Sequence, residues 1–132
     1  IPEVMQKCLE ETGDWLSVNG EAIFETRPWK VFGEGPSLKE VGFSSKDRHV
    51  FKSGDVRFTR NENTLYVIML EWPVNGEITL SSLKETKVRK ISLLGSKEKI
   101  RWNQSDQGLS ISLPAEQISP HANVLKLRCK KL

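Results

Sequence analysis

The sequence predicts a mainly β protein: an antiparallel β-sandwich of about eight strands preceded by one N-terminal α-helix. Apolar residues near the N-terminus recur at three- and four-residue spacing, which is typical of an amphipathic helix. From Trp29 onward, short strand-like segments follow one another at nearly regular spacing with turn signals between them, which is typical of a sandwich or barrel. No helical segment alternates with these strands, and this disfavours a parallel α/β sheet.

The first segment of the chain is expected to form this helix. Pro2 suits its first turn, where the N–H that proline lacks has no partner in any case. Asn19-Gly20 is a turn signal, so the helix should end before it. The apolar stripe of the helix comprises Ile1, Met5, Cys8, Leu9, Thr12, Trp15 and Leu16.

The strands are expected at residues 29–32, 56–59, 64–72, 77–80, 88–94, 99–103, 109–113 and 124–129, with a loop at 44–55. Turn signals separate several of them, such as Asn75-Gly76 and Asp106-Gln107-Gly108. Segment 64–72 is apolar on both of its faces. Such a strand belongs at the centre of a sheet that is covered on each side.

The composition fits one globular domain that binds neither nucleic acid nor a membrane. Of 132 residues, 37% are hydrophobic and 28% charged, so disorder is disfavoured. No apolar run approaches the roughly 20 residues of a membrane helix. The net charge of +3 is spread along the chain, and the densest basic run, 126–131, is explained by a lysine-guarded strand edge rather than by a nucleic-acid interface. The chain begins with Ile1 rather than methionine, so we expect a fragment or a processed product.

Cysteine and histidine usage predicts neither a metal site nor a cofactor. Cys8 and Cys129 lie at opposite ends of the chain without CxxC spacing, which favours two free thiols, although a disulfide between them stays open. His49 and His121 are isolated in polar contexts and are interpreted as surface residues. Asn103-Gln104-Ser105 is a formal N-glycosylation sequon, which has a consequence only if the source secretes through an endoplasmic reticulum.

Two stretches resemble α-L-fucosidases of glycoside hydrolase family 29. Residues 13–24 read GDWLSVNGEAIF and 26–29 read TRPW, where the family has GxWLxxNGEAIY and then a T-x-P-W run. The second stretch is VRFTR at 56–60, TLYVI at 64–68 and Trp72-Pro73. Weaker agreement continues through 91–95 and 108–114, so the resemblance spans nearly the whole chain. Phe24 departs from the family tyrosine, which removes a hydroxyl but leaves the expected fold unchanged.

The resemblance implies a catalytic barrel followed by a C-terminal β-sandwich. Residues 1–27 would then be the last barrel helix with a junction loop, and 28–132 the sandwich. The family hydrolyses terminal α-L-fucosyl linkages with retention, using an aspartate nucleophile and a carboxylic acid/base in the barrel. No residue of this chain matches them, so the chain alone is expected to be inactive. The implied partners are the parent barrel and, through it, fucosylated glycans, and the parent is expected to be extracytoplasmic.

The same motif supplies the candidate site residues, interpreted as a structural junction: Trp15, Asn19, Gly20, Glu21, Thr26, Arg27, Pro28 and Trp29. Glu21 has no partner carboxylate in any motif, so we expect it to anchor a tight Asn19-Gly20 turn by hydrogen bonds or by an ion pair with Arg27.

Two other functions compete with this structural interpretation. A carbohydrate-binding module would stack sugars on tryptophans, of which Trp102 is the best candidate for exposure, ahead of Trp29 and Trp72; core packing is the favoured interpretation of all three. A nucleic-acid-binding β-barrel would need basic and aromatic residues on one face, and strand alternation scatters them.

Overall fold

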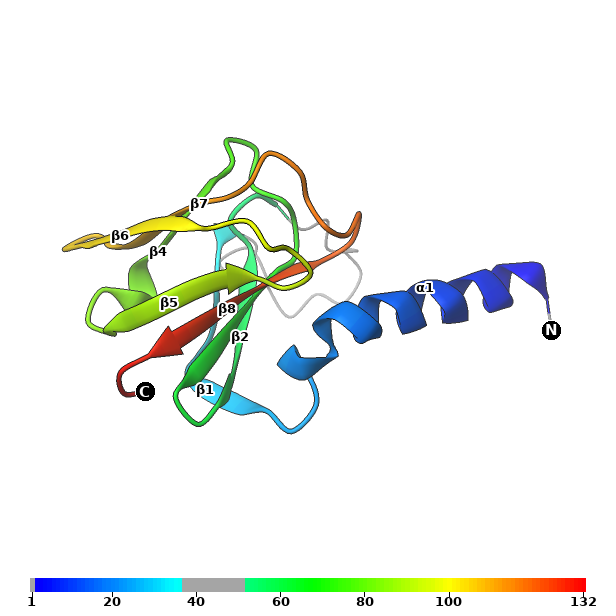
Figure 1. Cartoon of the computed structure of the whole chain (residues 1–132), viewed down its shortest axis with the longest axis horizontal. Helices are drawn as coiled ribbons and strands as arrows, with labels where there is room; N and C mark the ends of the chain where they lie inside the picture. Colours follow the sequence, from blue (N-terminus) through cyan, green and yellow to red (C-terminus); the bar gives the residue numbers. More distant parts are fainter. Residues whose placement is uncertain (1, 37–51) are drawn as a thin grey trace.

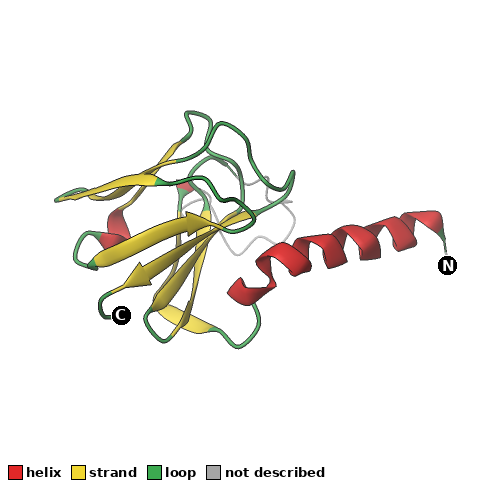
Figure 2. Cartoon of the chain, viewed as in Figure 1, coloured by secondary structure: helices red, strands yellow, loops and turns green. Residues whose placement is uncertain are grey.

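The computed structural model describes residues 2–36 and 52–132 and confirms the predicted fold class. Within these residues, one N-terminal helix precedes eight antiparallel strands in two sheets (Figures 1 and 2). The elements are α1 (Glu3–Asn19), the 3-10 helix η1 (Gly20–Ala22), β1 (Arg27–Glu34), β2 (Val56–Asn61), β3 (Thr64–Met69), β4 (Glu77–Leu80), the 3-10 helix η2 (Ser81–Leu83), β5 (Val88–Leu93), β6 (Arg101–Ser105), β7 (Gly108–Ser112) and β8 (Asn123–Cys129).

The larger sheet has the strand order β1-β2-β3-β8-β5, and the smaller one has the order β4-β7-β6. All pairings are antiparallel. Strand β3 lies at the centre of the larger sheet, as its apolar sequence predicts. Pro28 lies in the edge strand β1, where the N–H that proline lacks is not needed by a second neighbour.

The main core fills the space between the two sheets. Because side chains alternate between the faces of a strand, Leu65, Val67 and Met69 of β3 all point into it. The fully buried large side chains of this core come from both sheets and from η2: Leu65, Met69, Leu80, Leu83, Leu93, Leu109, Ile111, Leu125, Leu127, Val56 and Val67. A layer of this size supplies the hydrophobic free energy that holds the two sheets together.

A second, smaller cluster covers the opposite face of the larger sheet. Tyr66 and Ile68 of β3 and Val124 of β8 pack there against Ala22 of η1, with the half-buried Trp15 beside them. Strand β3 is therefore buried on both faces, which confirms the prediction made from its sequence.

Among the described residues, helix α1 packs on the sandwich mainly through its C-terminal half, where Trp15 and Asn19 lie, and an exposed ion pair joins Glu11 to His121. Every residue from 2 to 14 is exposed, and Figure 1 shows the helix running away from the body of the molecule with the N-terminus at its tip. The apolar stripe predicted for this helix therefore faces solvent along most of its length, and Cys8, expected on a buried face, is exposed.

Several predicted boundaries were wrong, each for a reason of tertiary structure. The strand expected to reach Trp72 ends at Met69, because its partner β8 begins opposite that residue. The strand expected at 99–103 is β6, shifted toward the C-terminus because its pairing starts at the two-residue loop between Ser105 and Gly108. Most of the predicted loop at 44–55 and His49 lie outside the described residues.

Gly108 is required where β7 begins. Its φ is +132°, and a Cβ there would lie 2.4 Å from the carbonyl oxygen of Leu80. Glycine therefore allows both the turn from β6 and the close approach of β7 to β4.

Candidate functional site

The predicted junction motif is a joint between helix and sandwich. We use "the joint" for residues 15–24 together with the side chains of β2, β3 and β8 that they contact. The motif begins in the last turn of α1, passes through η1 and lies on the outer face of the larger sheet. Its geometry fixes the direction in which α1 leaves the sandwich.

Three polar residues on neighbouring strands hold the joint. Thr59 of β2 lies opposite Tyr66 of β3, and Tyr66 lies opposite Lys126 of β8, so the three form a row across the outer face, here called the polar row. The Thr59 hydroxyl donates to the carbonyl oxygen of Ala22 over 2.6 Å. The Tyr66 hydroxyl and the Lys126 ammonium each lie 2.8 Å from the same carboxylate oxygen of Glu21.

The sequence predicts that Glu21 anchors a turn at Asn19-Gly20, but in the structure Glu21 binds Tyr66 and Lys126. Arg27, which starts the edge strand β1, is exposed. Burial raises the pKa of Glu21, yet the bonds from Lys126 and Tyr66 outweigh it and hold that pKa below the ordinary 4.5. Burial and the bond to Glu21 raise the pKa of Tyr66 to about 12. At neutral pH the joint thus holds an ionised carboxylate against a neutral phenol and an ammonium group.

Trp15 fixes the last turns of α1 to the other side of the joint. Its indole N–H donates to the carbonyl oxygen of Ala122 over 2.7 Å. The ring belongs to the apolar cluster on the outer face of the larger sheet. This bond and the bonds of Glu21 hold the C-terminal end of the helix on the sandwich.

The predicted turn at Asn19-Gly20 was wrong. Asn19 is the last residue of α1, and Gly20 continues into η1 with φ −59°, a conformation open to any residue. Glycine is favoured here because a side chain would be crowded: a Cβ would lie 3.0 Å from the ring of Phe24. Asn19 is 2% exposed, and among the described residues its Oδ1 has no hydrogen-bond donor.

The second half of the motif leads into the sandwich. Thr26 closes the loop after η1 by donating to the carbonyl oxygen of Ile23 over 2.9 Å. Arg27 and Pro28 open β1, and Trp29 is 6% exposed in the main core, where it packs edge-on against Phe58. The structure therefore brings together Trp15, Asn19, Gly20 and Glu21, but not Arg27, Pro28 and Trp29.

The sequence interpretation missed the polar row and Ala122. Lys126 offered a signal, because it stands between leucines in a strand whose other residues are mostly buried. Tyr66, the single tyrosine of the chain, offered another. Neither signal identifies a partner, since β3 and β8 are far apart in sequence.

The tryptophans do not offer the exposed sugar platform that a carbohydrate-binding module requires. Trp29 is buried, and Trp72 and Trp102 are half-buried against the main core. Trp102, the best candidate from the sequence, therefore packs inward from β6.

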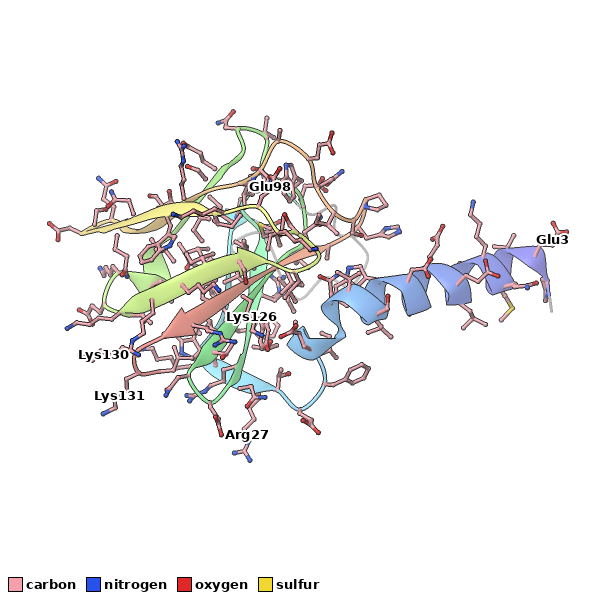
Figure 3. All side chains as sticks on the ribbon, in the orientation of Figure 1. Glu3, Arg27, Glu98, Lys126, Lys130 and Lys131 are labelled. Carbon is pink, nitrogen blue, oxygen red and sulfur yellow. The ribbon has the colours of Figure 1, made fainter. Side chains whose placement is uncertain are left out.

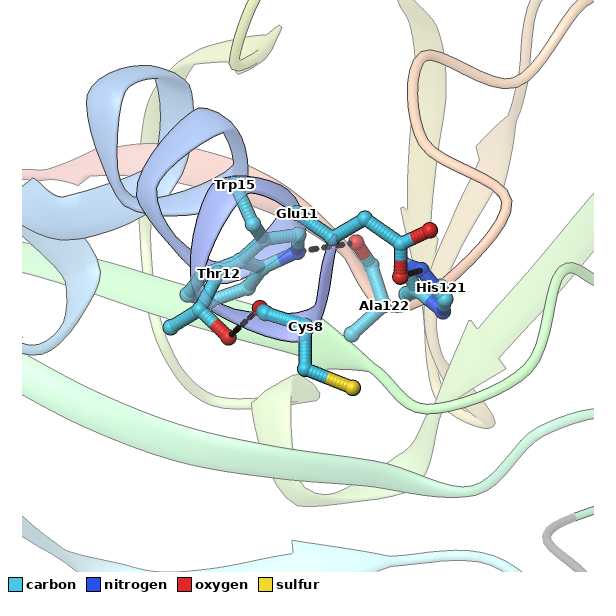
Figure 4. A pocket seen from close by; sticks show the side chains of 6 residues that line it. All are labelled: Cys8, Glu11, Thr12, Trp15, His121 and Ala122. Atoms are coloured by element: carbon cyan, nitrogen blue, oxygen red, sulfur yellow. Dashed lines mark hydrogen bonds and ion pairs between the residues drawn. The ribbon is translucent and has the colours of Figure 1, made fainter. Parts of the chain in front are cut away.

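A groove of about 360 Å³ lies beside the joint, between α1 and the loop that precedes β8. Figure 4 shows the groove with the bond from Trp15 to Ala122 and the ion pair between Glu11 and His121, 3.7 Å apart and well exposed. Cys8 and Thr12 complete its wall. Nearer the N-terminus of α1, Val4, Met5 and Leu9 are 76%, 58% and 64% exposed.

The described residues contain no cluster of histidine, cysteine and carboxylate side chains that could hold a metal ion. None of the described helices combines the length and apolar character needed to cross a membrane. Charged side chains are dispersed over the molecule. Figure 3 shows Lys130 and Lys131 at one end of it and Glu3 at the other end, at the N-terminal tip of α1. Both cysteines are free, as the sequence favoured.

Comparison with known proteins gives the same family as the motif. The family model described as "Alpha-L-fucosidase C-terminal domain" matches residues 51–128. Human tissue alpha-L-fucosidase is 36% identical over 123 residues, covering 92% of this chain and 22% of the relative. Rat plasma alpha-L-fucosidase is 32% identical over 119 residues, covering 86% of the chain and 22% of the relative.

A solved structure shares the fold. The Thermotoga maritima alpha-fucosidase, crystallised with a mechanism-based inhibitor, superposes with a TM-score of 0.73 at 22% identity, covering 97% of this chain and 27% of that one. The chain thus spans about a fifth of the length of its curated relatives. Its helix, its two-sheet body and its matched sequence together show that it belongs to the alpha-L-fucosidase C-terminal domain family.

Proposed function

We propose that this chain is the supporting end of an α-L-fucosidase and that α1 fastens it to a catalytic barrel on the same polypeptide. Residues 1–27 would be the last barrel helix and the junction, and 28–132 the supporting sandwich. The whole protein would hydrolyse terminal α-L-fucosyl linkages of glycans with retention, using carboxylates that lie outside this chain. The chain itself contributes rigidity and position rather than a reacting group.

The observation that carries this proposal is the uncovered apolar side of α1. Val4, Met5 and Leu9 are each more than half exposed, although side chains of this type are usually buried. They lie on the helix that the joint fixes in direction. A contiguous apolar surface on a rigidly held element is typical of a contact with another part of a protein.

The length of the relatives indicates what would cover this side of α1. This chain accounts for 22% of human tissue alpha-L-fucosidase, so the remaining residues of that relative are available to cover such a helix. We propose that the parent of this chain follows a secretory route. The rat relative named plasma alpha-L-fucosidase supports this proposal. Fucosylated glycans would reach the protein through the barrel and not through the sandwich.

The proposal is tested on the complete polypeptide and on the 132-residue chain in parallel. Leu9→Glu should lower the thermal stability and the fucosidase activity of the complete polypeptide, because it places a charge in the covered surface. It should leave the unfolding free energy of the isolated chain nearly unchanged, since Leu9 is exposed there. The matched control is Lys7→Glu, which introduces the same residue on another side of α1.

Equal effects of the two variants on the complete polypeptide would count against a covered apolar side. The isolated chain should show no turnover of an aryl α-L-fucoside. Hydrolysis by pure chain, proportional to its concentration, would contradict the assignment of the chemistry to residues outside it.

A further inference from the structure

We propose that Asn103 is an acceptor for an N-linked glycan. Of the six asparagines in the sequence, Asn103 alone is followed by any residue but proline and then by serine or threonine. This inference rests on the proposed secretory route, since the transferring enzyme acts in the endoplasmic reticulum. The proposed supporting role of the sandwich does not depend on Asn103.

The strand places the acceptor in solvent. In β6, Arg101, Asn103 and Ser105 are exposed, whereas Trp102 and Gln104 are half-buried, so the acceptor amide and the sequon hydroxyl share the outward face. The buried asparagines are different: Asn19 and Asn123 are each 2% exposed. Asn103 thus combines the sequon with the exposure that a glycan requires.

The surroundings of Asn103 leave room for a sugar. Its partner across the ladder is Ser110 of β7, and Ser110 in turn lies opposite Thr79 of β4. These two small hydroxyl groups lie 3.2 Å apart and are exposed. Among the described residues, none makes a hydrogen bond to the Asn103 side chain, so attachment breaks no hydrogen bond between them.

The backbone around the acceptor is held from the inner side. Gln104 donates to the carbonyl oxygens of Leu83 and Thr86 and accepts from the backbone N–H of Val88. These bonds tie β6 to the segment between η2 and β5. The strand therefore stays in place while the neighbouring Asn103 side chain remains free to carry a substituent.

A glycan at this position would not compete with the proposed docking of α1. The joint lies on the outer face of the larger sheet, whereas Asn103 lies on the outer face of the smaller one. Figure 1 shows β6 at the end of the sandwich opposite the tip of α1. The glycan would instead lie beside the edge of β6, which among the described strands pairs with β7 alone.

The modification is a group transfer from a lipid diphosphate-linked oligosaccharide. The amide nitrogen Nδ2 of Asn103 forms a C–N bond to the anomeric carbon of the donor sugar. The C–O bond from that carbon to the diphosphate breaks, and the lipid diphosphate leaves with the electron pair. One amide proton is released to the base of the transferase.

The test is expression of the full 132-residue chain behind a secretion signal in cultured mammalian cells. Total chain, whether secreted or retained, is treated with peptide N-glycosidase and compared on immunoblots. We expect a shift to lower apparent mass, and peptide mass spectrometry should find Asn103 converted to aspartate. Asn103→Gln and Ser105→Ala should abolish the shift, whereas Ser105→Thr should keep it. Asn61→Gln, at another exposed strand asparagine outside any sequon, should also keep it.

Absence of the shift in the unsubstituted chain overturns the proposal, as does a shift that survives Asn103→Gln. The added signal delivers the chain to the endoplasmic reticulum in any case. Failure of the proposed secretory route is measured separately, by locating the natural protein in its own cells. The two failures are therefore distinguishable.

Discussion

The bond between Tyr66 and Glu21 is the best place to measure how firmly the joint is held. The perturbation is a double-mutant cycle of Tyr66→Phe and Glu21→Ala, which isolates the interaction of the two side chains from their separate effects. A hydroxyl bonded to a carboxylate contributes about 1.5–3 kcal/mol when well shielded. The Glu21 side chain is 43% exposed, and solvent screening reduces this value. We therefore expect a coupling free energy of about 1 kcal/mol.

The assay is urea unfolding of the 132-residue chain, followed by tryptophan fluorescence and circular dichroism. In thermal unfolding, a loss of about 1 kcal/mol in the unfolding free energy should lower the melting temperature of a chain of this size by roughly 3–5 °C. The control cycle is Thr79→Val with Ser110→Ala, an exposed hydroxyl pair 3.2 Å apart, for which we expect about 0.5 kcal/mol or less. A Tyr66–Glu21 coupling below about 0.4 kcal/mol, within the usual error of additivity, would refute the anchoring role.

The same bond makes a prediction for pH. Because the pKa of Glu21 is held below 4.5 in the folded chain, its contribution to stability should be present above pH 4.5 and be lost as the pH falls below it. Because the pKa of Tyr66 is raised from 10 to about 12, its contribution should be present below pH 10 and be lost as the pH rises toward 12. Unfolding free energies across both ranges should show the alkaline loss in the unsubstituted chain but not in Tyr66→Phe.

Three further predictions concern single positions. Gly108→Ala should destabilise the chain by at least about 2 kcal/mol in urea unfolding, because it combines a positive φ with a Cβ 2.4 Å from the Leu80 carbonyl; a loss below 1 kcal/mol would contradict this. Thiol labelling at pH 8 should modify the exposed Cys8 rapidly and Cys129 only on unfolding, because burial raises the pKa of Cys129 to about 11; equal rates would be inconsistent with it. Asn19→Leu should stabilise the isolated chain by about 1 kcal/mol, because it removes a buried acceptor without a donor; lower stability would show that Asn19 has a donor in solution.

The elements that the sequence predicts well are those whose pattern is local. Strand β4 begins and ends as expected, and the burial of β3 on both faces follows from its unbroken apolar run. The position of β3 at the sheet centre follows from the same run, because only a central strand has neighbours and cover on every side. Local pattern thus predicts both the class of the fold and its most buried strand.

The joint was predicted only in part, because its contacts are not local. The motif predicts that Glu21 is an anchor. Its partner Lys126, however, is brought close by the pairing of β8 with β3, two strands that are far apart in the sequence. An ion pair with Arg27 was one of the two interactions expected for Glu21, beside hydrogen bonds within the turn. Gly20 illustrates the same difficulty: Asn-Gly is typical of a turn, yet here glycine makes room for the ring of Phe24.

Helix α1 depends both on local sequence pattern and on contacts with distant residues. An isolated helix of about 12–15 residues is only marginally stable in water, and most helices in proteins are held by packing of their apolar side. The last turns of α1 have that support from Trp15 and η1, whereas residues 2–14 have none from the described residues. The i, i+4 pair of Met5 and Leu9 gives a helix surrounded by water only about 0.2–0.5 kcal/mol. The proposed packing of another apolar surface on this side of α1 would supply the support that the described residues do not give to residues 2–14.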